Sequence, residues 1–477
     1  MTIHQNLIAG EWTGTTATAN INPSDTNDVV GEYAQGNASD MNAAIAAAKA
    51  AFPAWSRSGI LERHAILRKA SDEILARKDE LGRLLSREEG KTLAEGIGET
   101  VRAAQIFDFF AGEVLRLAGE TLPSVRPGIG VEVTREPLGV IGIITPWNFP
   151  IAIPAWKIAP ALAYGNTVVF KPADLVPGCA WAIVDILHRA GLPKGVLNLV
   201  MGRGSVVGQA MLDSPLLSGI TFTGSTGTGK RVALSSLEHN RKFQLEMGGK
   251  NPFVVLDDAD LNIAVEAAVN AAFFSTGQRC TATSRLIVTE GIHDRFVEAM
   301  TARLQGLTID NALKAGTHIG PVVDASQMKQ DEDYIEIGRK EGARLVFGGE
   351  RLNRETPGFY LQPALFTEAT NQMRISQEEI FGPVASVIRV KDYEEALGVA
   401  NDTPYGLSSG IATTSLKHAT HFKRNSEAGM VMVNLPTAGV DFHVPFGGRK
   451  ASSFGPREQG RYAAEFFTTV KTAYTLA

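Results

Sequence analysis

The stretch VIGIITPWNFPIAIPAWKIAPALAYGNTVVF, residues 140–170, decides the fold. It begins and ends with short apolar runs that favour strands, and the segment between them has the length and apolar content of a buried helix. Similar units follow. The expected strands are 140–144, 167–170, 196–200 and 219–222, and the expected helices are 152–164, 180–190 and 205–212. Strands that alternate with helices predict right-handed crossovers and a parallel sheet, with ligands bound at the carboxyl ends of the strands.

The segments on either side extend this pattern. Apolar spacing predicts further helices at 41–52, 61–76, 78–87, 94–117, 262–274 and 294–304. Ser39 or Asp40 is expected to cap the first of these, and Pro53 to end it. Strands are expected at 131–136, 252–256 and 285–288 and, as a strand that pairs with a partner, in the tail 463–474. The alternation after Gly249 therefore predicts a second α/β unit.

Composition narrows the class of protein. The chain has 477 residues, of which 44% are hydrophobic and 20% charged, as is usual for a soluble protein with a large core. A net charge of −5 argues against a nucleic-acid binder, which needs a basic face. The sequence has no secretory signal pattern and no apolar run of about 18 residues that would span a membrane. Two cysteines make no disulfide framework, so we expect a cytoplasmic protein. The length of the chain predicts several domains.

The two cysteines differ in their surroundings. Cys280 lies in STGQRCTAT, residues 275–283, beside an arginine and among small hydroxyl residues. Cys179 lies in VPGCAW, residues 176–181, where it resembles a small buried hydrophobe. A polar setting is typical of a reactive thiol. Cys280 is therefore the candidate nucleophile.

A glycine-rich turn follows the strand expected at 219–222. The run FTGSTGTGK, residues 222–230, precedes a helical stretch at 231–237 and would present backbone N–H groups to a phosphate. It nearly matches a P-loop, but Arg231 replaces the Ser or Thr that would ligate magnesium. The alternative is that Gly224, Gly227 and Gly229 only shape a tight turn. We interpret the run 222–230 as a nucleotide-binding turn that does not follow the P-loop pattern.

Four further polar side chains have patterns that suit a site. Glu246, in FQLEMGGK (243–250), is flanked by apolar residues that would raise its pKa toward general-base duty, although an exposed glutamate at a strand end is an alternative. Asn148, between two prolines, is a fixed amide donor for an oxyanion or a simple turn residue. Lys171 and Asp174 follow a buried strand where cofactor hydroxyls would lie, or they form a surface ion pair.

These motifs, together with QEEIFGP (377–383) and in this order, resemble those of the NAD(P)-dependent aldehyde dehydrogenase superfamily. The similarity extends from IAGEW (8–12) to PFGGRK (445–450). It implies an α/β fold with two doubly wound parallel-sheet domains and a small β oligomerisation element. Residues 1–118 and 138–247 would bind the cofactor, 248–445 would form the catalytic domain, and 119–137 and 455–477 would bridge subunits of a homodimer or homotetramer.

The resemblance implies a role for each matching residue. Cys280 corresponds to the nucleophile that forms a thioester, Glu246 to the general base that activates water, and Asn148 to the oxyanion donor. No metal is implied. The implied cofactor-binding residues are Ile144, Pro146, Trp147, Lys171, Asp174, Gly204, Gly208, Phe222, Gly224, Ser225, Gly227, Gly248, Glu379 and Phe381. Asp174 stands where NAD-specific members often have Glu, and the shorter carboxylate should repel a 2′-phosphate less, so we expect both NAD and NADP to be used.

The prediction of the substrate rests on fewer residues than the prediction of the family. Trp156 stands where succinic semialdehyde dehydrogenases carry an arginine. The runs around Cys280 and at 438–448 are most similar to those of bacterial α-ketoglutaric semialdehyde (2,5-dioxopentanoate) dehydrogenases. Arg279 is the candidate to hold the distant carboxylate, or else it tunes the thiolate. Phe442 and His443 are expected at the entrance.

Other activities remain open at this point. Within the family they are succinic or glutaric semialdehyde oxidation, general aliphatic aldehyde oxidation, and transfer of the thioester to coenzyme A. The last is disfavoured by Glu246. Outside the family they are a cofactor-independent cysteine esterase and a P-loop NTPase.

Overall fold

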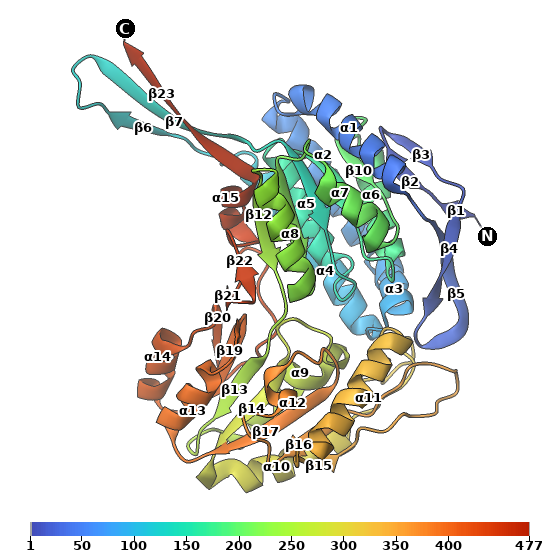
Figure 1. The fold of residues 1–477 in the computed structure, drawn as a ribbon, viewed down its shortest axis with the longest axis vertical. Coiled ribbons are helices and arrows are strands. Elements are labelled where there is room, and N and C mark those ends of the chain that lie inside the picture. Colours follow the sequence, from blue (N-terminus) through green and yellow to red (C-terminus); the bar gives the residue numbers. More distant parts are fainter. Residues whose placement is uncertain (1, 477) are drawn as a thin grey trace.

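The computed structural model describes residues 2–476, and its body has two halves, each built around one large sheet (Figure 1). The upper half in this view contains the N-terminus, and a strand arm projects from it. The chain passes from the upper sheet to the lower one between β12 (Lys242–Glu246) and β13 (Asn251–Val255). The short linker between these strands brings the carboxyl end of β12 to the boundary of the two halves.

The upper sheet has a parallel centre and antiparallel edges. In spatial order its strands are β22 (Ser453–Phe454), β12, β11 (Gly219–Thr223), β8 (Val140–Ile144), β9 (Thr167–Lys171), β10 (Leu197–Leu199), β2 (Asn6–Ile8) and β3 (Glu11–Thr13). The five strands from β12 to β10 are parallel, whereas β22, β2 and β3 run antiparallel to their neighbours. The predicted parallel sheet is therefore confirmed, with edges that the alternation did not indicate.

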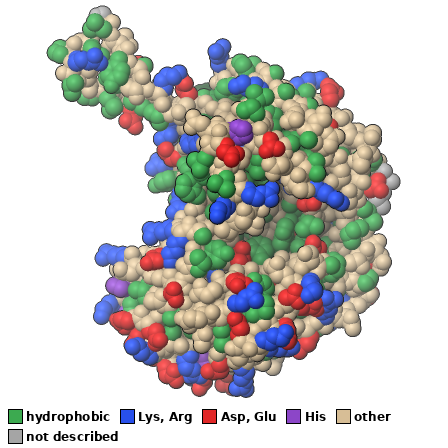
Figure 2. Space-filling view, in the orientation of Figure 1, with side chains coloured by type: hydrophobic (Ala, Val, Ile, Leu, Met, Phe, Trp, Pro, Cys, Tyr) green, Lys and Arg blue, Asp and Glu red, His purple; other side chains and the backbone are tan. Residues whose placement is uncertain are grey.

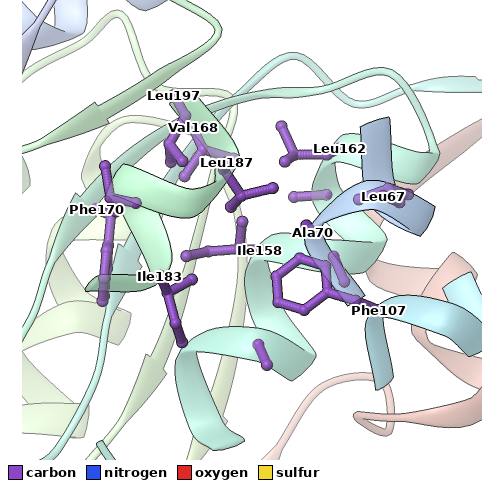
Figure 3. Packing of buried hydrophobic residues seen from close by; sticks show 14 of the residues in the cluster. Leu67, Ala70, Phe107, Ile158, Leu162, Val168, Phe170, Ile183, Leu187 and Leu197 are labelled. Carbon is purple, nitrogen blue, oxygen red and sulfur yellow. The ribbon is translucent and has the colours of Figure 1, made fainter. Parts of the chain in front are cut away.

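Helices cover both faces of this sheet, as in a doubly wound fold. Val168 and Phe170 of β9 point into one core and Val169 into the other, since side chains alternate along a strand. Figure 3 shows the larger core, where Leu67, Phe107, Ile158 and Ile183 pack on the sheet. The helices on that side are α2 (Ile60–Ala76), α3 (Lys78–Glu89), α4 (Leu93–Glu113), α5 (Ala152–Ala163) and α6 (Pro177–Arg189). On the other side are α1 (Ala38–Trp55), the π-helical η1 (Gly204–Gly208), α7 (Gln209–Asp213) and α8 (Thr226–Glu238).

The lower sheet repeats the design in the second half. Its strands are β15 (Arg344–Phe347), β16 (Ala364–Thr367), β17 (Val384–Val390), β14 (Thr283–Thr289), β13, β19 (Ser408–Ala412) and β20 (Met430–Val433), all parallel except β15. Its helices are α9 (Leu261–Phe273), the 3-10 turn η2 (Phe274–Gly277), α10 (Glu290–Gln305), α11 (Ala325–Lys340), α12 (Arg374–Gln377), α13 (Tyr393–Asn401) and α14 (Leu416–Asn425). Two apolar clusters fill the opposite faces of this sheet.

Three small strand groups complete the chain. An N-terminal sheet joins β1 (Ile3–His4), β5 (Asp25–Ala34) and β4 (Ala17–Asn22), and β18 (Tyr405–Gly406) pairs with β21 (Arg449–Lys450). The arm consists of β6 (Glu120–Pro123), β7 (Ile129–Pro137) and β23 (Thr468–Leu476). The arm stands away from the body in Figure 1.

Two predictions about local structure are wrong. Pro53 does not end the first helix, because α1 continues to Trp55 and the N–H of Ser56 still bonds to the carbonyl of Phe52 at 2.9 Å. The cap is Asn37 rather than Ser39 or Asp40. Its side chain accepts from the backbone N–H of Asp40, whose carboxylate accepts from the N–H of Asn37 in return.

The tail also differs from expectation. Residues 460–467 form the short helical turns η3 (Gly460–Ala463) and α15 (Ala464–Phe467), and only then does β23 begin. This strand pairs antiparallel with β7 of the same chain along its whole length, from Thr468 opposite Pro137 to Leu476 opposite Ile129. The strand with which the tail pairs is therefore β7 of the same chain, rather than a strand of a partner.

Candidate active site

Two cavities meet at Cys280. The first has a volume of about 420 Å³ and the second about 210 Å³, and Cys280 is the residue that lines both. The first is enclosed by Lys91, Glu95, Gly98, Glu99, Arg102, Phe149, Ala152, Trp156, Asn270, Ser275, Arg279, Thr281, Pro436, Ala438, Gly439, Val440 and Phe446. The second is enclosed by Pro146, Trp147, Asn148, Thr223, Gly224, Ser225, Met247, Gly248, Gln327, Gln330, Glu379 and Phe381. Both walls combine residues from the two halves of the body.

The backbone around Cys280 is held on both sides. Before it, Ser275, Thr276 and Gly277 all have positive φ angles, 51°, 57° and 67°. A Cβ at Gly277 would lie 2.2 Å from the carbonyl oxygen of Gly382, so only glycine allows this close approach. After it, the side-chain amide of Asn251 donates to the carbonyl of Cys280 at 2.8 Å. The thiol is therefore presented from a fixed turn.

The thiol is protonated at neutral pH in this state. Burial raises the pKa of Cys280 to about 12, and the carboxylates of Glu246 and Glu379 add to the rise. The opposing effects on this pKa come from the backbone N–H groups of Thr281 and of Cys280 itself. Activation of the thiol therefore requires a positive charge or a proton acceptor that is brought to it.

Asn148 is fixed by a buried network. Its Nδ2 donates to the carbonyl of Gln278 at 3.0 Å, and its own carbonyl accepts from the ammonium of Lys91. Lys91 pairs with Glu99 at 2.9 Å, and Glu99 accepts the backbone N–H of Ile151 at 3.0 Å. These contacts anchor the turn after β8, and the second N–H of the Asn148 amide is left for a ligand.

Glu246 lies at the end of β12 but lines neither cavity. Its carboxylate accepts a 2.5 Å hydrogen bond from the hydroxyl of Ser453, and a Cβ on Gly447 would lie 2.7 Å from its Oε1. Burial raises the pKa of Glu246 well above its usual value, the nearby Glu458 raises it further, and Ser453 and Lys157 lower it. The carboxylate therefore lies behind the cavity walls, close enough to Cys280 to raise the pKa of that thiol.

The second cavity has features that suit a dinucleotide. It lies at the carboxyl ends of β8 and β11, where ligands bind in such sheets. Ser225 caps α8, so the turn at Gly224 presents the helix N-terminus. On the opposite wall Glu379 accepts the backbone N–H of Gly249 at 2.9 Å, and a Cβ at Gly248 would clash with this carboxylate. Burial raises the pKa of Glu379 to about 6.

Other predicted cofactor residues lie around this cavity. The rings of Trp147 and Phe381 are perpendicular, with centroids 5.4 Å apart. Lys171, buried at the end of β9, has no hydrogen-bond or ion-pair partner for its ammonium within residues 2–476, and a Cβ on Gly204 would lie 3.8 Å from its Nζ. Burial lowers the pKa of Lys171, whereas the exposed Asp174 opposes this effect. The unpaired ammonium fits ribose hydroxyls or a phosphate.

Four further predicted cofactor residues do not line the second cavity. Ile144 ends β8 beside this cavity, and Phe222 is buried beneath the turn, where a Cβ at Gly224 would lie 2.7 Å from its ring. Gly208 ends η1, and a Cβ there would touch nothing within 4 Å. Gly227 already lies within the first turn of α8.

The glycine-rich run is shorter than the sequence suggested. The helix begins at Thr226 rather than 231, so Gly227 and Gly229 are helical, and a Cβ at Gly229 would lie 2.4 Å from the sulfur of Met247. Gly229 therefore serves helix packing. Lys230 is exposed on α8, so the arrangement is not that of a P-loop.

The first cavity contains two of the four predicted substrate residues. Trp156 stacks on Phe446 with centroids 5.4 Å apart. The guanidinium of Arg279 donates to Glu95 at 3.2 Å and to the hydroxyl of Ser275 at 3.0 Å. Its charge is thus already matched by a carboxylate in the cavity wall.

Phe442 and His443 lie outside the residues that line the first cavity. The ring of Phe442 packs near Phe109 with centroids 6.2 Å apart, and His443 is exposed. The neighbouring residues Ala438 and Val440 occupy the wall instead.

Comparison with known proteins agrees with this geometry. Residues 12–473 match the model of the aldehyde dehydrogenase family. The chain belongs to this family. It is 46% identical to α-ketoglutaric semialdehyde dehydrogenase of Bacillus subtilis over 98% of the chain and 97% of the relative.

Two solved structures have the same fold as this chain. A crystal structure of an NADP-dependent enzyme from E. coli superposes with a TM-score of 0.96 at 36% identity, covering 99% of this chain and 98% of that one. Betaine aldehyde dehydrogenase from Staphylococcus aureus in complex with NAD+ superposes with a TM-score of 0.96 at 33% identity, covering 99% and 94%. The predicted aldehyde dehydrogenase fold is confirmed.

This family member is an oxidoreductase that oxidises an aldehyde to a carboxylic acid with NAD or NADP. Within residues 2–476, no helix has the length and apolarity needed to span a membrane. The same residues contain no group of three or more His, Cys, Asp or Glu side chains suited to a metal ion.

The sequence pattern missed most of the first cavity. Glu95, Gly98, Glu99 and Arg102 are spaced i, i+3, i+4 and i+7 on α4, so they share one helix face. Such a polar stripe normally indicates a solvent-exposed face. Its spacing was visible in the sequence, but nothing local indicated that α5 and the 436–446 segment would enclose it.

Proposed function

We propose that this aldehyde dehydrogenase oxidises 2,5-dioxopentanoate (α-ketoglutaric semialdehyde) to 2-oxoglutarate. The observation that carries the catalytic part is the position of Cys280, which is common to both cavities. A substrate in the larger cavity and a cofactor in the smaller one would then meet at the same sulfur. The name of the Bacillus relative, at 46% identity over nearly the full length, supports the substrate.

Cys280 is the proposed nucleophile. The thiol of Cys280 gives its proton to water, the thiolate attacks the aldehyde carbon, and the carbonyl oxygen becomes an oxyanion. The free N–H of the Asn148 amide and the backbone N–H of Cys280 are the proposed donors to this oxyanion. Each such donor is typically worth about 10²–10³-fold in rate. The Lys91–Glu99 network supports this role because it fixes the turn that carries Asn148.

NAD or NADP supplies the hydride acceptor when bound. The residues proposed to hold it are those of the second cavity and its rim, with Lys171 and Glu379 at the riboses and Gly224 and Ser225 at the pyrophosphate. The remaining predicted residues, Ile144, Pro146, Trp147, Asp174, Gly204, Gly208, Phe222, Gly227, Gly248 and Phe381, surround or support this groove.

Glu246 is the proposed general base for the second half of the reaction. Loss of hydride from the tetrahedral carbon leaves a thioester on Cys280. Glu246 then takes a proton from water, the hydroxide attacks the thioester carbon, and the sulfur leaves as the acid is released. The raised pKa of the buried Glu246 supports this role, because such a carboxylate is a stronger base near neutral pH.

The arm is the proposed oligomerisation element. Residues 119–137 and 455–477 would bridge subunits, with 1–118 and 138–247 as the cofactor domain and 248–445 as the catalytic domain. Hydrophobic side chains gather on the projecting arm in Figure 2, and they include the exposed Leu122, Val470, Tyr474 and Leu476. An exposed apolar patch on a projecting element supports a homodimer or homotetramer.

A reducing, cytoplasmic compartment is proposed for the enzyme. Both cysteines are free thiols, and the proposed nucleophile must stay reduced to react.

Production of NAD(P)H from a panel of aldehydes tests the function. The panel contains 2,5-dioxopentanoate, 4-oxobutanoate, 5-oxopentanoate and pentanal. We expect the highest kcat/KM for 2,5-dioxopentanoate. A higher value for 4-oxobutanoate or 5-oxopentanoate would reassign the substrate, and ester hydrolysis that exceeds aldehyde oxidation and needs no NAD(P) would contradict the proposal.

A further inference from the structure

Arg102 is the third cation in the wall of the first cavity. It lies on α4, on the same helix face as Glu95 and Glu99, and its side chain is partly buried. The other cations of this wall are Lys91 and Arg279. The wall therefore has three cations and two carboxylates. Behind it, the buried Glu89 lies 3.8 Å from Lys91, but burial raises the pKa of Glu89 to about 8, so it is mostly uncharged at pH 7 and one positive charge remains in excess.

The hydrogen bonds show which cation is in excess. Lys91 is paired with Glu99 at 2.9 Å, and Arg279 is paired with Glu95 at 3.2 Å. Within residues 2–476, Arg102 makes no ion pair. The carboxylate of Glu99 attracts Arg102 most strongly, but it lies beyond ion-pair distance and is already bound to Lys91. The side chain of Asp441 attracts Arg102 less, is exposed to solvent and lies outside the cavity wall.

The donors of Arg102 are mostly unused. One N–H, on Nη2, donates to the amide oxygen of Gln459 at 3.2 Å, and the buried Nε has no acceptor in the described chain. Gln459 itself is fully buried, and its Nε2 also lacks an acceptor there. A guanidinium has five N–H donors, and leaving them unmatched in a partly dry site costs free energy. An anion in the cavity that accepts from the terminal N–H groups of Arg102 would offset part of this cost.

The rest of the wall suits a short carbon chain. Phe149, Trp156, Val440 and Phe446 present apolar surface in the same cavity. A molecule with an aldehyde at Cys280 and a carboxylate at its other end would place its methylene groups along this surface.

We propose that Arg102 is the residue that selects aldehydes with a distal carboxylate, and that the uncharged Gln459 positions its guanidinium. This inference deepens the proposed function and rests on it. Arg279 then has the separate task of holding the turn before Cys280 through Ser275 and Glu95. An arginine already paired with a carboxylate is a poor anion site, whereas an unpaired one is a good site.

Two ratios of kcat/KM test the proposal separately from the proposed substrate. The ratio of 5-oxopentanoate to pentanal measures recognition of the carboxylate at constant chain length. The ratio of 2,5-dioxopentanoate to 5-oxopentanoate measures recognition of the 2-oxo group. We expect Arg102→Leu and Arg102→Gln to lower the first ratio at least about tenfold, the size of a hydrogen bond to a charged group. Arg102→Lys should recover part of it.

Two variants serve as comparisons. Arg279→Leu should lower turnover of all three aldehydes and keep the first ratio. Arg116→Leu, at an exposed arginine that pairs with Glu113 just beyond α4, should leave both ratios as in wild type. The positioning role of Gln459 predicts that Gln459→Leu raises KM for 5-oxopentanoate more than it changes kcat.

The possible outcomes are distinct. If both Arg102 variants keep the first ratio within twofold of wild type, or if Arg279→Leu is the variant that lowers it, the anchor is not Arg102. If wild type has a high first ratio and a second ratio below one, the anchor stands and the proposed substrate is wrong. A first ratio near one in wild type overturns both.

Discussion

The hydroxyl of Ser453 donates a 2.5 Å hydrogen bond to Oε2 of Glu246, which ties the carboxylate at the end of β12 to the edge strand β22. Because the same hydroxyl accepts the backbone N–H of Gly448 at 2.6 Å, Ser453 connects Glu246 to the segment that follows the first cavity. The bond has two effects. It stabilises the ionised carboxylate, and it fixes the side chain at a position outside both cavity walls.

We therefore expect Ser453→Ala to move the acid limb of the kcat–pH profile to higher pH. Removal of the hydrogen bond raises the pKa of Glu246 further above its usual value. A base acts as its carboxylate, so activity is present above this pKa and is lost as the pH falls through it. Steady-state profiles of wild type and variant measure the shift, with Ser453→Thr as the control that keeps a hydroxyl. An unchanged acid limb would separate Ser453 from the base.

Glu246→Gln should spare the first half of the reaction more than the second. In the proposed mechanism, formation of the thioester needs Cys280, whereas its hydrolysis needs the water activated by Glu246. Stopped-flow absorbance should therefore show a burst of NAD(P)H, close to one equivalent per active site, followed by slow turnover. A variant with the wild-type steady-state rate and no burst would remove Glu246 from the mechanism.

Cys280 should react slowly with alkylating reagents in the absence of cofactor. With its pKa raised to about 12 by burial and by Glu246 and Glu379, the thiolate fraction rises about tenfold per pH unit from pH 7 to pH 10. Iodoacetamide labelling followed by peptide mass spectrometry measures this rate. Cys179, fully buried and with its pKa also raised by burial, should remain unlabelled in the folded protein.

Substitution of each cysteine by alanine also distinguishes the proposed nucleophile from the buried thiol, by its effect on activity. Cys280→Ala should lower kcat roughly a thousandfold or more, as removal of a nucleophile does. Cys179→Ala should keep measurable turnover. A labelling rate at Cys280 that levels off near pH 8 would contradict the raised pKa.

Both dinucleotides should support turnover. Asp174 is exposed, and the buried ammonium of Lys171 has no partner in residues 2–476, so a 2′-phosphate meets a cation as well as a carboxylate. We expect Asp174→Glu to raise the NAD-to-NADP ratio of kcat/KM, and Lys171→Gln to raise the KM of both. A wild-type preference for NAD above about a thousandfold, or about 4 kcal/mol, would rule out the predicted dual use.

Two glycines should respond to alanine with opposite signs. Gly277→Ala places a Cβ 2.2 Å from the carbonyl oxygen of Gly382 at a φ of 67°, so we expect a loss of about 2 kcal/mol or more in the free energy of unfolding. Gly98→Ala adds a methyl group to α4 where nothing lies within 4 Å, and it should gain about 0.5–1 kcal/mol from helix propensity. Denaturant unfolding measures both, and equal effects would contradict the contact geometry.

Much of the fold could be predicted from local patterns. The strand at 140–144 matches β8, the helix at 152–164 matches α5 to within one residue, and the strand at 167–170 matches β9 to within one residue. Apolar periodicity is reliable there because these elements are buried in the sheet or against it. The edge strands β2, β3 and β22 escaped prediction, because two to three residues at a sheet edge have no distinct period.

Prediction of the site from the sequence was also limited to what local patterns show. Cys280, Asn148 and Gly224 were identified because short motifs surround them, and the structure brings all three to the cavities. The pairing of Arg279 with Glu95 joins residues 184 positions apart, which no local pattern indicates. The hypothesis that Arg279 holds the distant carboxylate of the substrate therefore could not be judged from the sequence.

The sequence by itself determined the family, the alternation of strands and helices, and the residue types available for aldehyde chemistry. These depend on short-range spacing and on motifs that survive without their surroundings. Only the tertiary structure decided which charges neutralise one another. By folding α4 against α5 and the turn before Cys280, it matches Lys91 and Arg279 with carboxylates and leaves Arg102 unpaired in the cavity wall. Whether a charge is matched depends on distances between residues remote in sequence, and those distances exist only in the folded chain.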